Sequence, residues 1–254
     1  IGWPLSLLAL FFIIKIFSTQ APTLVTNLHT IQPALLGFGI FSFVIFYFVR
    51  SYLWCRIIKQ YGYELPFRES GYLWAMSELK RYIPGNVWSF LGRAVLFQEK
   101  GVTKKDVGKG LIIEAAIFVL GSGIVSLLSL PFILPEQYAG YGSLIEFLVI
   151  ITVILYCQNR KILLLFSDKL RRPIHFLFPP FPPRETFFLI GLSTIALFFF
   201  GLGNYLVITS VVFLDPKIIL SLIGLFVLAF VAGYLSIITP AGFGVREGIV
   251  LFAL

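Results

Sequence analysis

Long apolar runs recur along almost the whole chain, and they constrain its fold more than any other feature. A helix that spans a bilayer needs about 20 mostly apolar residues, and only 13% of this chain is charged, about half the share in a typical soluble domain. The runs cover residues 1–17, 33–49, 110–130, 143–156, 186–208 and 218–238, and another starts near Arg246. The pattern predicts an all-α, polytopic membrane protein with six to seven transmembrane helices plus broken or re-entrant helices.

The apolar runs are spread evenly, without a polar segment long enough to form a separate soluble module. We therefore expect a single transmembrane domain over residues 1–254. The chain starts at Ile1 without a methionine and stops at Leu254 inside an apolar run. We interpret both ends as cut from a longer protein.

Basic residues are distributed unevenly between the predicted spans. Of the 20 Lys and Arg residues, 11 lie within 50–109 and six within 160–184, whereas 18–32 and 131–142 contain none. Lys and Arg concentrate in cytoplasmic loops. We therefore expect a protein of the plasma (cytoplasmic) membrane, with the N-terminus and the loops 50–109 and 158–185 in the cytoplasm.

The stretch from Glu78 to Arg93 interrupts the apolar pattern with charged residues around a Pro84-Gly85-Asn86 break. Proline removes a backbone donor, and glycine and asparagine tolerate positive φ, so we expect two short helical pieces joined by a kink. Such a broken, charged segment is tolerated at membrane depth only where it is buried in protein or lines a wet cavity. The stretch is therefore our first candidate for a site.

A second break, Pro240 to Gly248, repeats this order of proline, glycine and a basic residue that opens an apolar run. Paired helix breaks point to a transporter-type binding site, and Arg246 beside a helix N-terminus forms an anion site. We predict that the tip at 84–87 and the turn at 242–245 approach each other. Arg81 or Arg93 would then face a common cavity with Arg246.

Other residues inside the predicted spans concern packing and charge. Glu114 lies in the run 110–130, where a carboxylate costs a few kcal/mol unless it meets a partner or water. Lys109 or Arg93 could be that partner, and a structural role is as well supported as a functional one. Glycines, among them Gly121, Gly201 and Gly203, would let helices approach closely.

Within the loop 50–109, the segment 101–106 is expected to form a turn and a helix start. The part before Phe67 is expected to be an interfacial continuation of the second span.

The motifs RYIPGNVWSFLGR (81–93) and PAGFGVREG (240–248), with Glu114 between them, resemble the lysylphosphatidylglycerol synthase transmembrane-region family. The similarity covers the chain from about the second span to the end. That family includes the flippase half of the bacterial MprF proteins and free-standing membrane proteins, some beside glycosyltransferases. The resemblance implies translocation of a charged, aminoacylated phospholipid. It does not imply synthase activity, because that activity belongs to a separate soluble domain that this sequence lacks.

Our leading hypothesis is therefore a protein that binds and translocates an anionic or aminoacylated phospholipid, with membrane lipids as its partners. The residues expected to bind the lipid or its anionic head group are Arg81, Tyr82, Pro84, Gly85, Asn86, Trp88, Arg93, Glu114, Gly242, Gly244, Arg246 and Glu247.

Two alternatives stay open. One is a non-catalytic partner or anchor of a lipid-modifying enzyme or a glycosyltransferase. The other is an intramembrane lipid-phosphate transferase, although the sequence has no Ser-His-Asp order, no paired carboxylates within one turn and no Walker-type loop. His29 and His175 have no cysteine or carboxylate at ligand spacing, so we predict no metal. We also predict no cofactor and no nucleic-acid partner.

Overall fold

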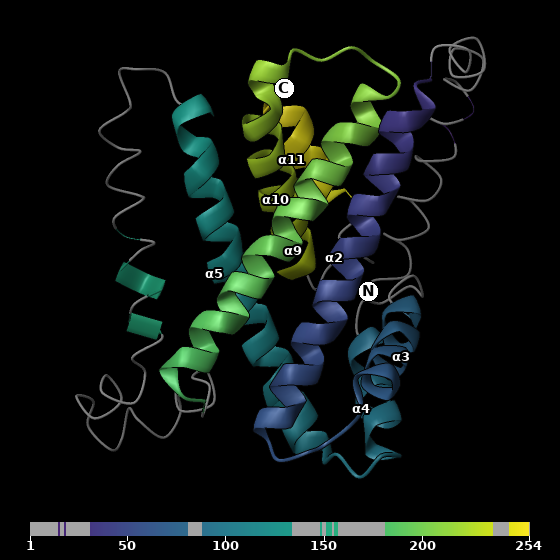
Figure 1. The fold of residues 1–254 in the computed structure, drawn as a ribbon, viewed down its shortest axis with the longest axis vertical. Coiled ribbons are helices and arrows are strands. Elements are labelled where there is room, and N and C mark those ends of the chain that lie inside the picture. The colour runs from purple at the N-terminus through teal and green to yellow at the C-terminus, as the bar shows by residue number, and fades with distance from the viewer. Residues whose placement is uncertain are drawn as a thin grey trace.

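The structure is a computed structural model that describes residues 31–80, 88–133, 181–235 and 244–253, with the separate positions 15, 18, 148, 151–153, 155 and 156. Every regular element in these parts of the chain is helical, as Figure 1 shows. The helices are α2 (Pro33–Gln60), α3 (Phe67–Leu79), α4 (Trp88–Gln98), α5 (Lys104–Ile133), α9 (Pro183–Thr209), the 3-10 helix η5 (Pro216–Ile218), α10 (Ile219–Leu235) and α11 (Val245–Ala253). The predicted all-α class is confirmed for the described residues.

Four of the described helices are long and apolar enough to cross a membrane: α2, α5, α9 and the segment Pro216–Tyr234, which covers nearly all of α10. They correspond to four of the predicted runs. Large apolar side chains on α2, such as Phe38, Phe41 and Phe48, are at least 60% exposed, as expected of a face that meets lipid. The runs 1–17 and 143–156 lie wholly or mostly outside the described residues, so the count of six to seven spans stays a prediction.

Helices α2 and α9 run side by side in opposite directions (Figure 1). The backbone N–H of Gln32, just before α2, donates to the carbonyl of Ser210 at the end of α9, at 2.9 Å. A Cβ atom placed on Gly39 would lie 3.2 Å from the carbonyl oxygen of Gly203. The predicted role of Gly203 in close packing is therefore confirmed.

Helix α9 also crosses α5 and α10 at glycines. A Cβ placed on Gly201 would lie 2.8 Å from the carbonyl oxygen of Ile223 in α10. One placed on Gly121 in α5 would collide with the Ser193 hydroxyl of α9, which donates to the Ile117 carbonyl at 2.9 Å. These contacts confirm the predicted packing role of both glycines and hold α9 closely against α5 and α10.

Two helices extend beyond the apolar runs that predict them. Helix α2 continues beyond 49 to Gln60, so the predicted continuation of the second span is confirmed, and Trp54 and Ile57 in its last turns are fully enclosed by protein. Whether these turns lie at the membrane interface stays a prediction. Helix α5 starts at Lys104, six residues before the predicted span. The Thr103 hydroxyl accepts a hydrogen bond from the Asp106 N–H at 3.2 Å, as an N-cap does. The predicted helix start in this segment is confirmed.

Helices α3 and α4 form a short hairpin beside the C-terminal half of α2 (Figure 1). At 13 and 11 residues they are roughly 20 and 17 Å long, too short to cross the hydrocarbon core. Trp74 of α3 and Phe97 of α4 pack with Trp54 of α2 in one buried cluster. The two predicted helical pieces are confirmed, while the break between them, 81–87, lies outside the described residues.

Candidate functional site

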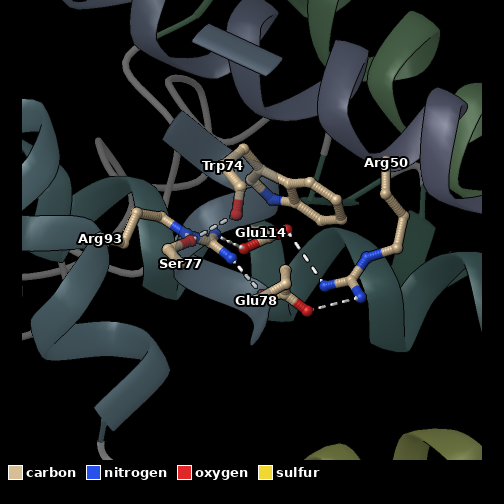
Figure 2. A network of polar contacts seen from close by, with 6 residues as sticks. All are labelled: Arg50, Trp74, Ser77, Glu78, Arg93 and Glu114. Atoms are coloured by element: carbon tan, nitrogen blue, oxygen red, sulfur yellow. Dashed lines mark hydrogen bonds and ion pairs between the residues drawn. The ribbon is translucent and has the colours of Figure 1, made fainter. Parts of the chain in front are cut away.

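Four buried charged side chains form a closed ring at the place where the hairpin meets the long helices. Arg50 of α2 contacts Glu78 of α3 (Nη1–Oε2, 3.2 Å) and Glu114 of α5 (Nη2–Oε1, 3.4 Å). Arg93 of α4 contacts the other oxygens of the same carboxylates, Glu78 at 2.5 Å and Glu114 at 2.6 Å. Figure 2 shows the two carboxylates between the two guanidinium groups.

This ring lies deep in the bundle. Arg50 is ten residues before the end of α2, and Glu114 is ten residues after the start of α5. With a rise of about 1.5 Å per residue, each lies about 15 Å from the end at which the two helices meet. Four successive helices therefore each contribute one charged side chain to a single point inside the bundle.

Aromatic rings surround the two guanidinium groups. The Cζ atom of Arg50 lies 4.9 Å from the ring centroid of Phe118 and 5.0 Å from that of Trp74. The Cζ atom of Arg93 lies 4.4 Å from the ring centroid of Trp54. Such cation–π contacts partly replace the hydration that a buried cation loses.

The ring has no net charge, because two arginines face two glutamates. Burying charges is costly, and only good geometry with paired partners offsets that cost. Breaking such a buried pair typically destabilises a protein by about 3–5 kcal/mol. The ring therefore fixes the α3–α4 hairpin against α2 and α5.

Sequence reasoning found only part of this ring. The predicted pairing of Glu114 with Arg93 is confirmed, whereas Lys109 pairs with Asp106 at 3.1 Å. Arg50 was missed as a site residue, because the second span was ended at 49 and Arg50 was assigned to the membrane interface. The available signal was the apolar sequence that resumes directly after it, with no helix-breaking residue before Gly62, where φ is 88°.

A cavity of about 750 Å³ adjoins one side of the ring. Its charged lining residues are Arg50 and Glu78 from the ring, with Arg246 and Glu247 from α11. Apart from Ser51 and Gly71, apolar and aromatic residues line the rest: Val44, Tyr47, Phe48, Trp74, Ala75, Leu79 and Phe230. Several of these, including Phe48 and Leu79, are more than half exposed on the outside of the bundle. The cavity therefore connects buried charges to an outward-facing apolar surface.

Arg246 lies where α11 packs on α10. Its Cζ atom is 4.7 Å from the ring centroid of Phe230, and a Cβ placed on Gly233 would lie 2.7 Å from its side chain. Arg246, Phe230 and Glu247 also line a second cavity, of about 530 Å³, beside Phe200 and Asn204 of α9. Arg246 therefore lines both of these cavities.

Glu247 lines both cavities and also accepts a hydrogen bond that stabilises the start of α11. Its Oε2 accepts the backbone N–H of Gly244 at 2.6 Å, three residues earlier. A glutamate in the first turn that reaches back to the N-cap N–H is one half of a capping box. Gly244 has a φ of 86°, which favours glycine. Both residues thus define the start of α11.

The remaining predicted site residues are placed as follows. Trp88 is half exposed at the start of α4 and does not line either cavity. Arg93 is fully buried in the ring and is also absent from both linings, so among the described residues it is Arg50 that shares a cavity with Arg246. A lipid-binding role for Arg93 stays an untested prediction. Predicted site residues outside the described part of the chain are Arg81, Tyr82, Pro84, Gly85, Asn86 and Gly242.

The described residues hold no group of three or more His, Cys, Asp or Glu side chains that could bind a metal ion. What they do present is a pair of arginines and a pair of glutamates around a cavity with an apolar opening. This arrangement can bind a molecule that has both a charged head and a hydrocarbon part.

The helices and the site define a polytopic α-helical membrane protein. The family model of the lysylphosphatidylglycerol synthase TM region matches residues 1–254, so the chain belongs to that family. A search of curated proteins found no match, and no solved structure was found to be similar.

Proposed function

We propose that this protein binds a membrane lipid through a phosphate-containing head group and moves it between the two leaflets. The observation that carries this proposal is the cavity that joins Arg50 and Arg246 to an outward-facing apolar rim. A head group would occupy the charged end while its acyl chains stay at the rim, beside Val44, Phe48 and Leu79. The volume, about 750 Å³, is in the range of ligand sites.

The main barrier that such a protein must lower is the free-energy cost of moving a charged head group through the bilayer centre. A charged group costs several kcal/mol or more at the bilayer centre, and buried arginines or cavity water reduce that cost. Arginine suits this task because its planar fork grips two phosphate oxygens at once, whereas lysine offers a point charge. Glu78 and Glu247 in the same cavity could contact an ammonium group. Anionic and aminoacylated phospholipids therefore both fit the proposal.

The second cavity supports movement rather than binding alone. Phe200 and Asn204 of α9 line it, whereas residues of α2 and α3 line much of the first cavity. Arg246, Glu247 and Phe230 line both. A head group that passes from one cavity to the other would keep contact with Arg246 throughout.

The test is downhill lipid movement in liposomes. Purified protein is reconstituted with phosphatidylglycerol, or its lysyl ester, that carries a fluorophore on one acyl chain, and a membrane-impermeant reductant bleaches the outer leaflet. We expect bleaching to exceed half of the fluorescence with wild-type protein. Arg246→Lys should slow movement about tenfold, since it keeps the charge but loses the two-oxygen grip. Arg56→Lys is the matched control, because Arg56 pairs with Glu185 at 2.7 Å and lines neither cavity.

Equal bleaching in wild-type and protein-free liposomes would contradict lipid movement and favour a non-transporting partner of a lipid-modifying enzyme. If the wild-type protein moves lipid and the Arg246→Lys and Arg56→Lys variants move it at equal rates, the proposed role of Arg246 would be contradicted, but lipid movement itself would not.

A further inference from the structure

The two arginines of the ring differ in how completely they are bonded. Arg93 uses all of its guanidinium nitrogens: Nε donates to Ser77 Oγ at 3.1 Å, and Nη1 and Nη2 contact the two carboxylates at 2.6 and 2.5 Å. Arg50 makes longer contacts with the same carboxylates, at 3.2 and 3.4 Å. Its buried Nε has no hydrogen-bond partner in the described part of the molecule. Arg50 therefore retains unused donor capacity.

The same difference appears in their position relative to the cavity. Arg50 and Glu78 line it, whereas Arg93 and Glu114 do not. Trp74, which also lines the cavity, has a buried indole Nε1–H without a hydrogen-bond partner among the described residues. A buried donor left unsatisfied costs free energy, because it has lost its hydrogen bonds to water. A ligand that brings hydrogen-bond acceptors into this cavity could satisfy both donors.

We infer that Arg50 is a phosphate-binding residue of this cavity and that Glu78 is its internal competitor. In the structure the Glu78 carboxylate contacts the Arg50 guanidinium at 3.2 Å, and both residues line the cavity. An entering phosphate replaces Glu78 on Arg50 and accepts hydrogen bonds that the carboxylate leaves unmade. This assignment rests on the proposed function, since it names the group that holds the head group.

The ring permits this exchange without leaving a buried charge alone. Glu78 Oε1 contacts Arg93 in the same structure, so Glu78 keeps a cationic partner when its other oxygen loses Arg50. Arg50 keeps its contact with Glu114. Isolated buried charges are what make broken ion pairs costly, and in this exchange each charge retains at least one opposite neighbour. Glu78 thus sets how strongly Arg50 attracts an anion.

The test measures binding of dodecyl phosphate to the purified full chain in dodecyl maltoside, whose own chain has the same length and carries an uncharged sugar. Glu78→Gln removes the competitor and should tighten binding on the order of tenfold, the value of one charge-assisted contact. Arg50→Gln should weaken binding at least tenfold. In the double variant Arg50→Gln/Glu78→Gln the gain should disappear, because Glu78 acts through Arg50. The matched control is Glu185→Gln, which removes a carboxylate from Arg56 outside the cavity and should leave binding unchanged.

Two outcomes would overturn the inference. One is that Glu78→Gln binds no more tightly than Glu185→Gln. The other is that its gain persists in the Arg50→Gln background, which would make it an effect of net charge. If Arg50→Gln does not fold, Arg50→Lys replaces it in both variants, since it keeps the charge and loses the fork. Absence of binding by the wild-type protein would instead count against head-group binding in the proposed function.

Discussion

Arg93 Nη1 and Glu114 Oε2 lie 2.6 Å apart, and neither side chain is exposed. This ion pair joins the short helix α4 to the long helix α5 across 21 positions of the sequence. The hairpin that carries Arg93 is too short to span a membrane, and its burial depends on partners from the spanning helices. A charge pair, rather than apolar contact alone, therefore fixes its place.

The first prediction concerns the stability that this pair provides. Glu114→Gln leaves Arg50 and Arg93 to share one carboxylate inside the bundle, so we expect a loss of about 3–5 kcal/mol in the free energy of unfolding. The measurement is unfolding by sodium dodecyl sulfate in mixed micelles. Glu69→Gln is the control, because the Lys100–Glu69 pair also joins α3 to the end of α4 but is partly exposed. Its unfolding curve should stay close to that of the wild type. Similar losses in the free energy of unfolding for the two variants would mean that the buried ring stabilises the protein no more than the exposed pair does.

Much of the fold could be predicted from the sequence, because bilayer thickness converts apolar length directly into spans. The role of glycines such as Gly201 in helix contacts was also predicted correctly, because a residue without a side chain lets a neighbouring helix approach at that position. The ring was only partly predicted, since pairing across α2, α3, α4 and α5 depends on tertiary contacts. Arg50 illustrates this limit. A single arginine after an apolar run indicates a membrane interface, and only the packing of α3 and α5 around it shows that it is buried.

The second prediction tests the close helix contacts with two glycines on one helix. A Cβ at Gly201 would meet the Ile223 carbonyl at 2.8 Å, whereas a Cβ at Gly191 has no heavy atom within 4 Å. Gly201→Ala should therefore cost about 1–3 kcal/mol, because backbone atoms must move apart. Gly191→Ala should be neutral or slightly stabilising, since alanine is the better helix former. Thermal unfolding in detergent compares the two variants. Indistinguishable transition temperatures would show that α9 and α10 are packed more loosely than the structure indicates.

The third prediction concerns orientation in the membrane. Lys104 and Asp215 are exposed and lie at the starts of α5 and of the α10 segment, at opposite ends of the bundle. The distribution of basic residues predicts that Lys104 faces the cytoplasm. In a variant without Cys55 and Cys157, a cysteine at 215 should react with an impermeant maleimide added to intact cells, and one at 104 only after the cells are opened. The reverse pattern at both positions would invert the predicted topology.

The last prediction concerns the start of α11, which positions Arg246. Gly244 has a φ of 86°, where an L-amino acid costs about 1–2 kcal/mol, and its N–H donates to Glu247. Gly244→Ala should therefore loosen the first turn of α11, and amide hydrogen exchange there should become about tenfold faster. Because Arg246 lies in that turn, lipid movement in liposomes should slow as well. Gly248→Ala is the matched control within the same helix, since a Cβ there meets nothing within 4 Å and its φ is ordinary. That variant should exchange at the wild-type rate or more slowly. If the two variants exchange alike and both move lipid normally, the Gly244 turn is not what holds Arg246 between the two cavities.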